Sequence, residues 1–189
     1  MKKVKLQGLF KEFDTFCNSD KKNLVIRGFD NWDKFIYTLE MLSKEQVKEK
    51  VLLETYFIRN LKDIFEVNGL SKSVIHTGET KVIKGIKLLF DKYTTTDNLY
   101  ADNEYAIFYP IEAVLYKPND LKKLANKVKK LRTKHNIFIT TNDYSDKVDK
   151  LYEYINIDET LILDLNEFYS DKYKTIRENA KKDNRKLPY

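Results

Sequence analysis

Four lysines in the second half of the chain, Lys123, Lys127, Lys130 and Lys134, recur about one helical turn apart. On a helix this spacing places their ammonium groups in one stripe, which is able to follow the phosphates of a nucleic-acid backbone. The same stripe is also typical of an ordinary solvated helix face. Lys117, just before this segment, belongs to the same basic set. The sequence therefore leaves two interpretations open, phosphate contact and solubility.

Other residue types that carry chemistry in proteins form no familiar motif. The chain contains no Gly-x-x-x-x-Gly-Lys-Ser/Thr phosphate loop and no Gly-x-Gly-x-x-Gly fingerprint. His76 and His135 do not lie at metal-ligand or catalytic-triad spacing, so we interpret both as structural or surface residues. The single cysteine, Cys17, lies on an expected helix face beside Phe16, which favours packing over nucleophilic attack.

Composition favours a globular protein in a reducing compartment. One cysteine cannot form an intramolecular disulfide, and the chain has neither a signal peptide nor an apolar stretch of about 18 residues. We therefore expect a cytoplasmic protein with no membrane contact. The length of 189 residues suits a single domain. The formal net charge is +6, with basic residues 119–135 and 171–189 and acidic residues 140–171, and these opposite blocks are able to neutralise one another in the fold. DNA or RNA is the favoured partner because of the lysine stripe.

Three apolar runs separated by two helical patterns organise residues 96–170. The runs are Tyr105–Tyr116, Ile137–Thr140 and Leu161–Leu165, and we expect strands there, with Pro110 interrupting the first. Strands that alternate with helices of this length indicate parallel βαβ units, so we expect the second and third runs to be neighbours. Residues 179–189 have the composition of a frayed basic tail. The predicted fold is α/β, with a central mixed sheet flanked by helices.

Residues 1–95 are predicted to be mostly helical. Apolar spacing indicates a helix within residues 1–18, a strand at Asn23–Arg27, and a helix after Asp30, whose side chain is placed to cap it. Ser43-Lys-Glu-Gln46 fits a capping box at the start of a helix that runs to about residue 68. A third helix is expected over residues 78–93.

The stretch from Ile111 to Phe168 resembles the distal half of the restriction-endonuclease-like fold, nearest to the Mrr-type nuclease domain. In that family a strand carries Glu/Gln-x-Lys, a helix follows, a second strand ends in a Thr-Thr or Thr-Ser pair, and a last strand ends near Asp or Gly. The matching segments here are Ile111-Glu-Ala-Val-Leu-Tyr-Lys117, Ile137-Phe-Ile-Thr-Thr-Asn-Asp-Tyr-Ser-Asp146 and Glu159-Thr-Leu-Ile-Leu-Asp-Leu-Asn-Glu-Phe168. The resemblance covers about a third of the chain.

This resemblance implies a metal-dependent nuclease site. Glu112 would be a strand carboxylate that binds Mg²⁺ together with an upstream acid, Asp102, and the metal would activate water for phosphodiester cleavage. The chain departs from the family at Val114, where the family has lysine. The implied function is therefore nucleic-acid binding, either as a nuclease or as a degenerate, non-catalytic descendant.

A second hypothesis belongs to another functional class. The acidic segment from Asp143 to Asp164 and the excess of aromatic residues are compatible with a protein-binding module, such as an inhibitor or an assembly subunit, without catalysis. Independently of both hypotheses, Thr141-Asn142-Asp143 follows a predicted parallel strand. Open α/β sheets bind ligands at that end of their strands.

Overall fold

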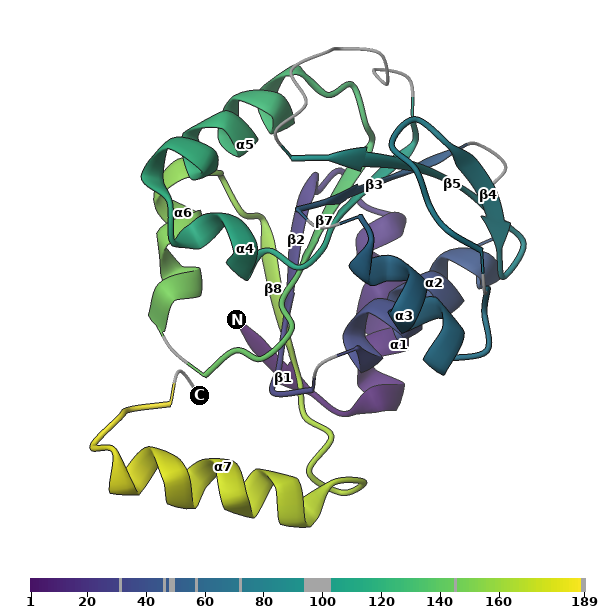
Figure 1. Ribbon diagram of the computed structural model, residues 1–189. Helices are drawn as coiled ribbons and strands as arrows, with labels where there is room; N and C mark the ends of the chain where they lie inside the picture. The colour runs from purple at the N-terminus through teal and green to yellow at the C-terminus, as the bar shows by residue number, and fades with distance from the viewer. Residues whose placement is uncertain are drawn as a thin grey trace.

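The structure is a computed structural model that describes residues 1–30, 32–45, 47, 50–56, 58–71, 73–93, 103–144 and 146–187. Within these residues, eight strands form one sheet in the order β1-β8-β2-β7-β6-β3-β5-β4 (Figure 1). Neighbouring strands run parallel except β4 and β5, which form an antiparallel hairpin at one edge. The α/β fold class with a mixed sheet is therefore confirmed.

The strands are short, and every residue of β2, β3, β6, β7 and β8 is buried. Their bounds are β1 Lys2–Val4, β2 Asn23–Arg27, β3 Val51–Thr55, β4 Thr80–Ile83, β5 Ile86–Lys92, β6 Tyr105–Phe108, β7 His135–Ile139 and β8 Glu159–Leu163. The helices are α1 Leu6–Cys17, α2 Asp33–Lys44, α3 Asn60–Val67, α4 Glu112–Leu115, α5 Pro118–Lys130, α6 Lys150–Tyr154 and α7 Ser170–Lys182, with a 3₁₀ helix, η1, at Asp146–Asp149. None of the described helices is long and apolar enough to cross a membrane.

Helices cover both faces of the sheet (Figure 1). One face packs against α1, α2 and α3 through a core that includes Phe13, Phe35 and Phe65. The other face packs against α4, α5 and α6 through a second core that includes Val114, Leu124 and Leu151. Residues on a strand point alternately to the two faces, so strands buried on both sides are apolar at consecutive positions.

The path of the chain creates a crevice at one end of the sheet. From β1 to β5 the connecting helices lie on the first face, and from β6 to β8 they lie on the second. The neighbouring strands β3 and β6 therefore lead into helices on opposite faces, α3 and α4. Such a switch point leaves an opening beyond the carboxyl ends of the two strands.

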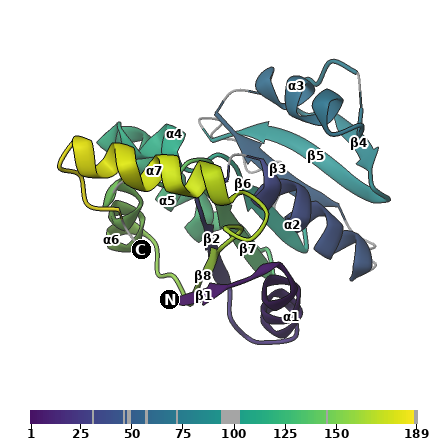
Figure 2. The ribbon, with the colours of Figure 1, turned by 90° about the horizontal axis from the view of Figure 1, so that it is seen from below.

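The last helix, α7, crosses the carboxyl end of the sheet on the side of β8 and β2 (Figures 1 and 2). Tyr173 anchors it, because its hydroxyl donates to Asp30 and accepts the N–H of Leu165, both at 2.9 Å. Lys172 pairs with the same Asp30 at 2.9 Å. Asp30 thus fixes α7 and does not cap α2, whose N-cap residue is Trp32. The helix continues to Lys182, so residues 179–182 of the expected basic tail are helical.

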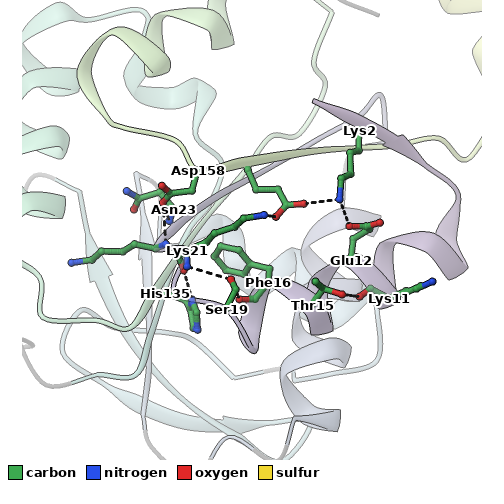
Figure 3. A network of polar contacts seen from close by, with 12 residues as sticks. Lys2, Lys11, Glu12, Thr15, Phe16, Ser19, Lys21, Asn23, His135 and Asp158 are labelled. Atoms are coloured by element: carbon green, nitrogen blue, oxygen red, sulfur yellow. Dashed lines mark hydrogen bonds and ion pairs between the residues drawn. The ribbon is translucent and has the colours of Figure 1, made fainter.

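The opposite, amino end of the strands is held by a polar network (Figure 3). The Asp158 carboxylate accepts the backbone N–H groups of Lys22 and Asn23 at 2.9 and 2.8 Å. The ring nitrogens of His135 lie 2.8 and 3.0 Å from the carbonyl oxygens of Lys21 and Cys17. Burial lowers the pKa of His135 and raises that of the Cys17 thiol to about 12. Both residues are structural, in agreement with the sequence interpretation.

Two segments expected as helices contain strands. Residues 43–68 hold the end of α2, then β3 and α3, and residues 78–93 hold the β4–β5 hairpin. The five buried residues of β3 face both cores, and a short run that is apolar on both sides has no period that separates strand from helix. In the hairpin, Lys84 and Gly85 both have positive φ, as a two-residue turn of this kind requires. The N-terminal part is therefore not mostly helical.

The expected strands of the second half exist, but their arrangement differs. β7 and β8 are not neighbours, because β2 lies between them and runs parallel to both. The first apolar run is a strand only as far as Phe108. After Tyr109 and Pro110 the chain enters α4, so Glu112 begins a helix and the expectation of a strand carboxylate is wrong.

Candidate functional site

The carboxyl ends of β3, β6 and β7 border a cavity of about 390 Å³, which we call the edge pocket. It lies at the switch point between β3 and β6, where open α/β sheets bind ligands. Its polar and aromatic walls come from the β2–α2 loop, the three strand ends and the start of α3, and consist of Trp32, Thr55, Asn60, Asp63, Tyr109 and Thr141. Thr141 is the first residue of the segment after β7 that was predicted to bind a ligand.

Thr55, the last residue of β3, is the most informative of these residues. Its side chain is fully buried, and its Oγ1 has no hydrogen-bond partner within the described part of the chain. A buried hydroxyl without a partner costs roughly 1–3 kcal/mol. Since Thr55 lines the pocket, a bound ligand is able to supply the missing partner.

Aromatic rings and one carboxylate complete the pocket. Trp32 is the only tryptophan of the chain and is half-buried. Tyr109 is buried and stacks on Phe35, with ring centroids 4.4 Å apart. Asn60 and Asp63 are three residues apart on α3, so they share one helix face, and both are exposed. The edge pocket therefore offers flat apolar surface, hydrogen-bonding groups and one negative charge.

A larger hollow of about 560 Å³ lies beside β1 and β8. Its charged groups neutralise one another: Lys21 pairs with Glu159 at 2.7 Å, and Arg27 pairs with Asp149 at 2.7 Å. We place the candidate site in the smaller edge pocket, because the hydroxyl without a partner lies there and because the pocket lies at the switch point.

The β2–α2 loop beside the pocket has the outline of a phosphate-binding loop. It joins a strand to a helix, begins at Gly28 and reaches Lys34 six residues later, the spacing of glycine and lysine in that motif. A Cβ on Gly28 would lie 2.8 Å from the Leu163 carbonyl oxygen, so this position needs glycine. The motif's second glycine and its Ser/Thr are replaced by Asp33 and Phe35, which is why the pattern is not found in the sequence.

Lys34 does not point to a ligand position. It is fully buried, and its Nζ donates to the carbonyl oxygens of Gly28 at 3.0 Å, Thr141 at 2.6 Å, and Asp30. Burial lowers its pKa, against the opposing charge of Glu112. An ammonium group has three donors, and all three are used here. Lys34 therefore joins the β2–α2 loop to the end of β7.

Glu112 is tied to the same strand end. Its Oε1 accepts the backbone N–H of Thr141 at 2.7 Å and lies 3.3 Å from the Thr141 hydroxyl. Its Oε2 is sealed from solvent and has no partner among the described residues. Burial raises the pKa of Glu112. Because one oxygen holds a backbone amide and the other is enclosed, the carboxylate does not fit the role of an open Mg²⁺ ligand.

A second buried cluster joins two acids and a lysine, and sequence reasoning missed it. Glu54 of β3 and Asp91 of β5 are register partners, and Lys127 of α5 places its Nζ 2.5 Å from Glu54 Oε1 and 2.9 Å from Asp91 Oδ2. The contact with Glu54 is an ion pair without hydrogen-bond geometry. Both acids are fully buried, and burial raises the pKa of Glu54 to about 8. Both acids lie in segments that were predicted to be helices, and nothing in the sequence marks them as buried partners.

The lysine stripe is only partly available to a partner. Lys127 is held in the ion pairs with Glu54 and Asp91, and Lys134 is exposed but donates to the Cys17 carbonyl oxygen at 3.2 Å. Lys123 and Lys130 are exposed on α5. Exposed Lys117 contacts the Tyr56 hydroxyl at 3.0 Å, and Tyr56 directly follows Thr55 of the pocket. The structure therefore brings Lys117, and not the stripe, to the carboxyl end of β3.

The acidic segment expected as a protein-binding surface is largely used within the fold. Asp143 is buried against Arg27, with Oδ2 2.5 Å from Nε. Asp149 pairs with the same arginine, Asp158 caps the start of β2, and Asp164 pairs with Lys3 at 3.2 Å. Few of these carboxylates remain for a partner.

Asp102, the expected second metal ligand, lies outside the described residues. Within the described ranges, no group of three or more His, Cys, Asp or Glu side chains converges to hold a metal ion. Comparisons of the chain with protein-family models, with curated proteins and with solved structures each found no match.

Proposed function

We propose that this protein binds single-stranded nucleic acid and holds one unstacked base in the edge pocket, without cleaving the strand. The observation that carries the proposal is the buried Thr55 hydroxyl, without a described partner, in a pocket with the rings of Trp32 and Tyr109. Proteins that recognise single strands stack bases on aromatic side chains and hydrogen-bond their edges.

The size and chemistry of the pocket fit a base better than a whole nucleotide. A volume of about 390 Å³ is near the lower end of the usual range for ligand sites, roughly 300–1,000 Å³. Asp63 on the rim repels a phosphate but accepts hydrogen bonds from the N–H groups of a base. A base in the pocket with its phosphates outside agrees with both constraints.

Cationic groups lie close to the mouth of the pocket. Arg59 and Lys62 flank the pocket residues of α3 in the sequence, and Lys117 contacts Tyr56, the residue that follows Thr55. These side chains are placed to contact the phosphates on either side of a captured base. The net charge of +6 adds a general attraction for a polyanion.

Cleavage is not part of the proposal, because the acidic groups at this end of the sheet are enclosed. Neither Glu112 nor Glu54 lines the edge pocket, so a phosphodiester held at its mouth does not meet their carboxylates. Lys34, at the position of a phosphate-loop lysine, is fully occupied by backbone carbonyl oxygens. The proposal thus keeps the non-catalytic form of the nucleic-acid-binding hypothesis.

The test uses Trp32 as an internal reporter, since no other tryptophan contributes to the emission. Single-stranded RNA and DNA octamers are titrated into the protein at low salt, and both Trp32 fluorescence and the anisotropy of a labelled strand are recorded. We expect both signals to saturate at the same strand concentration. A strand that binds without altering Trp32 emission, or no binding at all, would contradict the proposal.

The salt dependence locates the phosphate contacts. Each contact with a single strand contributes roughly 0.7 to the slope of log affinity against log salt. Lys117→Gln should therefore lower the slope by about that amount. Lys174→Gln, on the exposed side of α7, is the matched control and should leave the slope unchanged. Equal slopes for the Lys117 variant and the parent would remove this residue from the proposed interface.

A further inference from the structure

The first turn of α3 gives the edge pocket a directional hydrogen-bonding wall. Asp63 is exposed, lines the pocket, and has no lysine or arginine within ion-pair distance among the described residues. An ionised carboxylate accepts hydrogen bonds through two oxygens and donates none. It therefore favours a ligand that presents two neighbouring N–H donors, which bind the two oxygens side by side.

Among the common bases, guanine alone presents two adjacent donors on its pairing edge, the N1–H and the 2-amino group. Adenine and cytosine present one amino group beside an acceptor nitrogen, and uracil and thymine present one N–H between two carbonyl groups. Proteins read the pairing edge of an unstacked base through such patterns. The carboxylate of Asp63 matches guanine and meets at least one acceptor on every other base.

The remaining groups of the pocket complement the rest of a guanine. The keto oxygen O6 lies next to N1–H and needs a donor, and the Thr55 hydroxyl has no described partner for its proton. The half-buried Trp32 provides a ring surface on which a purine can stack. The buried hydroxyl without a partner is independent of the carboxylate, and both belong to the same cavity.

We propose that the edge pocket selects guanine, with Asp63 accepting from N1–H and the 2-amino group and Thr55 donating to O6. This inference rests on the proposed capture of a base. The recognised chemistry is the guanine edge, which a free nucleotide and a nucleic-acid strand both carry. The two sources differ only in the phosphates outside the pocket.

The experiment compares ligands that differ by one group. Trp32 fluorescence is titrated with the 5′-monophosphates of guanosine, inosine and adenosine, and with single-stranded tetranucleotides that carry one of these bases among uridines. Inosine lacks only the 2-amino group, so one charge-assisted hydrogen bond is lost, and we expect affinity to fall roughly 10- to 100-fold. Tighter binding of the guanosine tetranucleotide than of the monophosphate identifies a strand as the ligand, and equal binding identifies the free nucleotide.

Variants separate selection from capture. Asp63→Asn should bring the guanosine-to-inosine affinity ratio close to one, whereas Glu66→Gln, on the exposed side of the same helix, should preserve it. Equal affinity of the parent protein for all three bases would overturn the guanine inference while leaving base capture intact. Failure of every strand and nucleotide to bind would overturn both the inference and the proposed function.

Discussion

Replacement of Thr55 by valine should stabilise the folded protein and weaken ligand binding at once. The two side chains have nearly the same shape, and a β-branched residue suits the end of β3. Because Thr55 is fully buried and its Oγ1 has no described partner, valine removes an uncompensated polar group. This removal should raise the free energy of unfolding by about 1 kcal/mol. For a chain of this size that corresponds to a melting temperature higher by about 2–4 °C.

The effect on binding has the opposite sign. A neutral hydrogen bond to a ligand contributes about 0.5–1.5 kcal/mol, so Thr55→Val should raise the dissociation constant for a single strand roughly 2- to 10-fold. Unfolding is measured by urea titration with circular dichroism, and binding by anisotropy of a labelled octamer. Higher stability together with weaker binding is expected only where a polar group serves a ligand and destabilises the free protein.

Thr133→Val is the matched control, because Thr133 is also buried but its hydroxyl donates to Asn136 at 2.6 Å. Valine there leaves a buried acceptor without its partner and should lower stability by roughly 1–3 kcal/mol. If Thr55→Val were destabilised to the same extent, its hydroxyl would have a partner in the free protein. If Thr55→Val were more stable but bound strands as tightly as the parent, the edge pocket would not be the binding site.

Three further substitutions test the buried charges. Lys34→Met should lower the free energy of unfolding by roughly 3–5 kcal/mol in urea titrations, because three carbonyl oxygens lose their donor. An unchanged free energy of unfolding would contradict the role of Lys34 in joining the β2–α2 loop to β7. Lys127→Gln should cost a similar roughly 3–5 kcal/mol because it leaves the buried Asp91 carboxylate without its cation. Lys123→Gln on the same helix should stay within about 0.5 kcal/mol. The pKa of Glu54 is raised from 4.5 to about 8 in the fold, so its contribution to stability is fully present below pH 4.5 and is lost as the pH rises through 8. Between pH 5 and pH 8.5 the parent should lose stability at a rate that approaches about 1.4 kcal/mol per pH unit, and Glu54→Gln should reduce this loss. If the variant and the parent had the same pH profile of unfolding, the raised pKa of Glu54 would be refuted.

The success of sequence reasoning followed the strength of the local periodicity. The helix that became α5 was predicted because Leu121, Leu124 and Val128 form a narrow apolar stripe against a polar remainder. Its predicted end near residue 135 was wrong, since α5 ends at Lys130 and Lys134 lies beyond it. β3 was missed because Val51-Leu-Leu-Glu-Thr55 is buried on both faces and carries no alternation. The strand order was not predicted for another reason. β2 lies between β7 and β8 although more than 100 residues separate it from either strand in the sequence, and no local pattern indicates such a pairing.

The candidate site was predictable in position but not in composition. The carboxyl end of β7 was expected to carry a ligand, and Thr141 does line the edge pocket. Thr55 and Trp32 were not expected there, since both lie in segments that were predicted to be helices. Lys127 gave the opposite error, because its sequence context is that of a solvated lysine, whereas its partners Glu54 and Asp91 come from distant strands. A charge pattern along one helix specifies spacing, but only the packing of that helix on the sheet decides which charges meet water. The same packing that buries the Lys127 ammonium group against Asp91 leaves Lys117 exposed, next to Tyr56. Tertiary structure therefore divides the basic set into an internal counter-ion and a candidate phosphate contact.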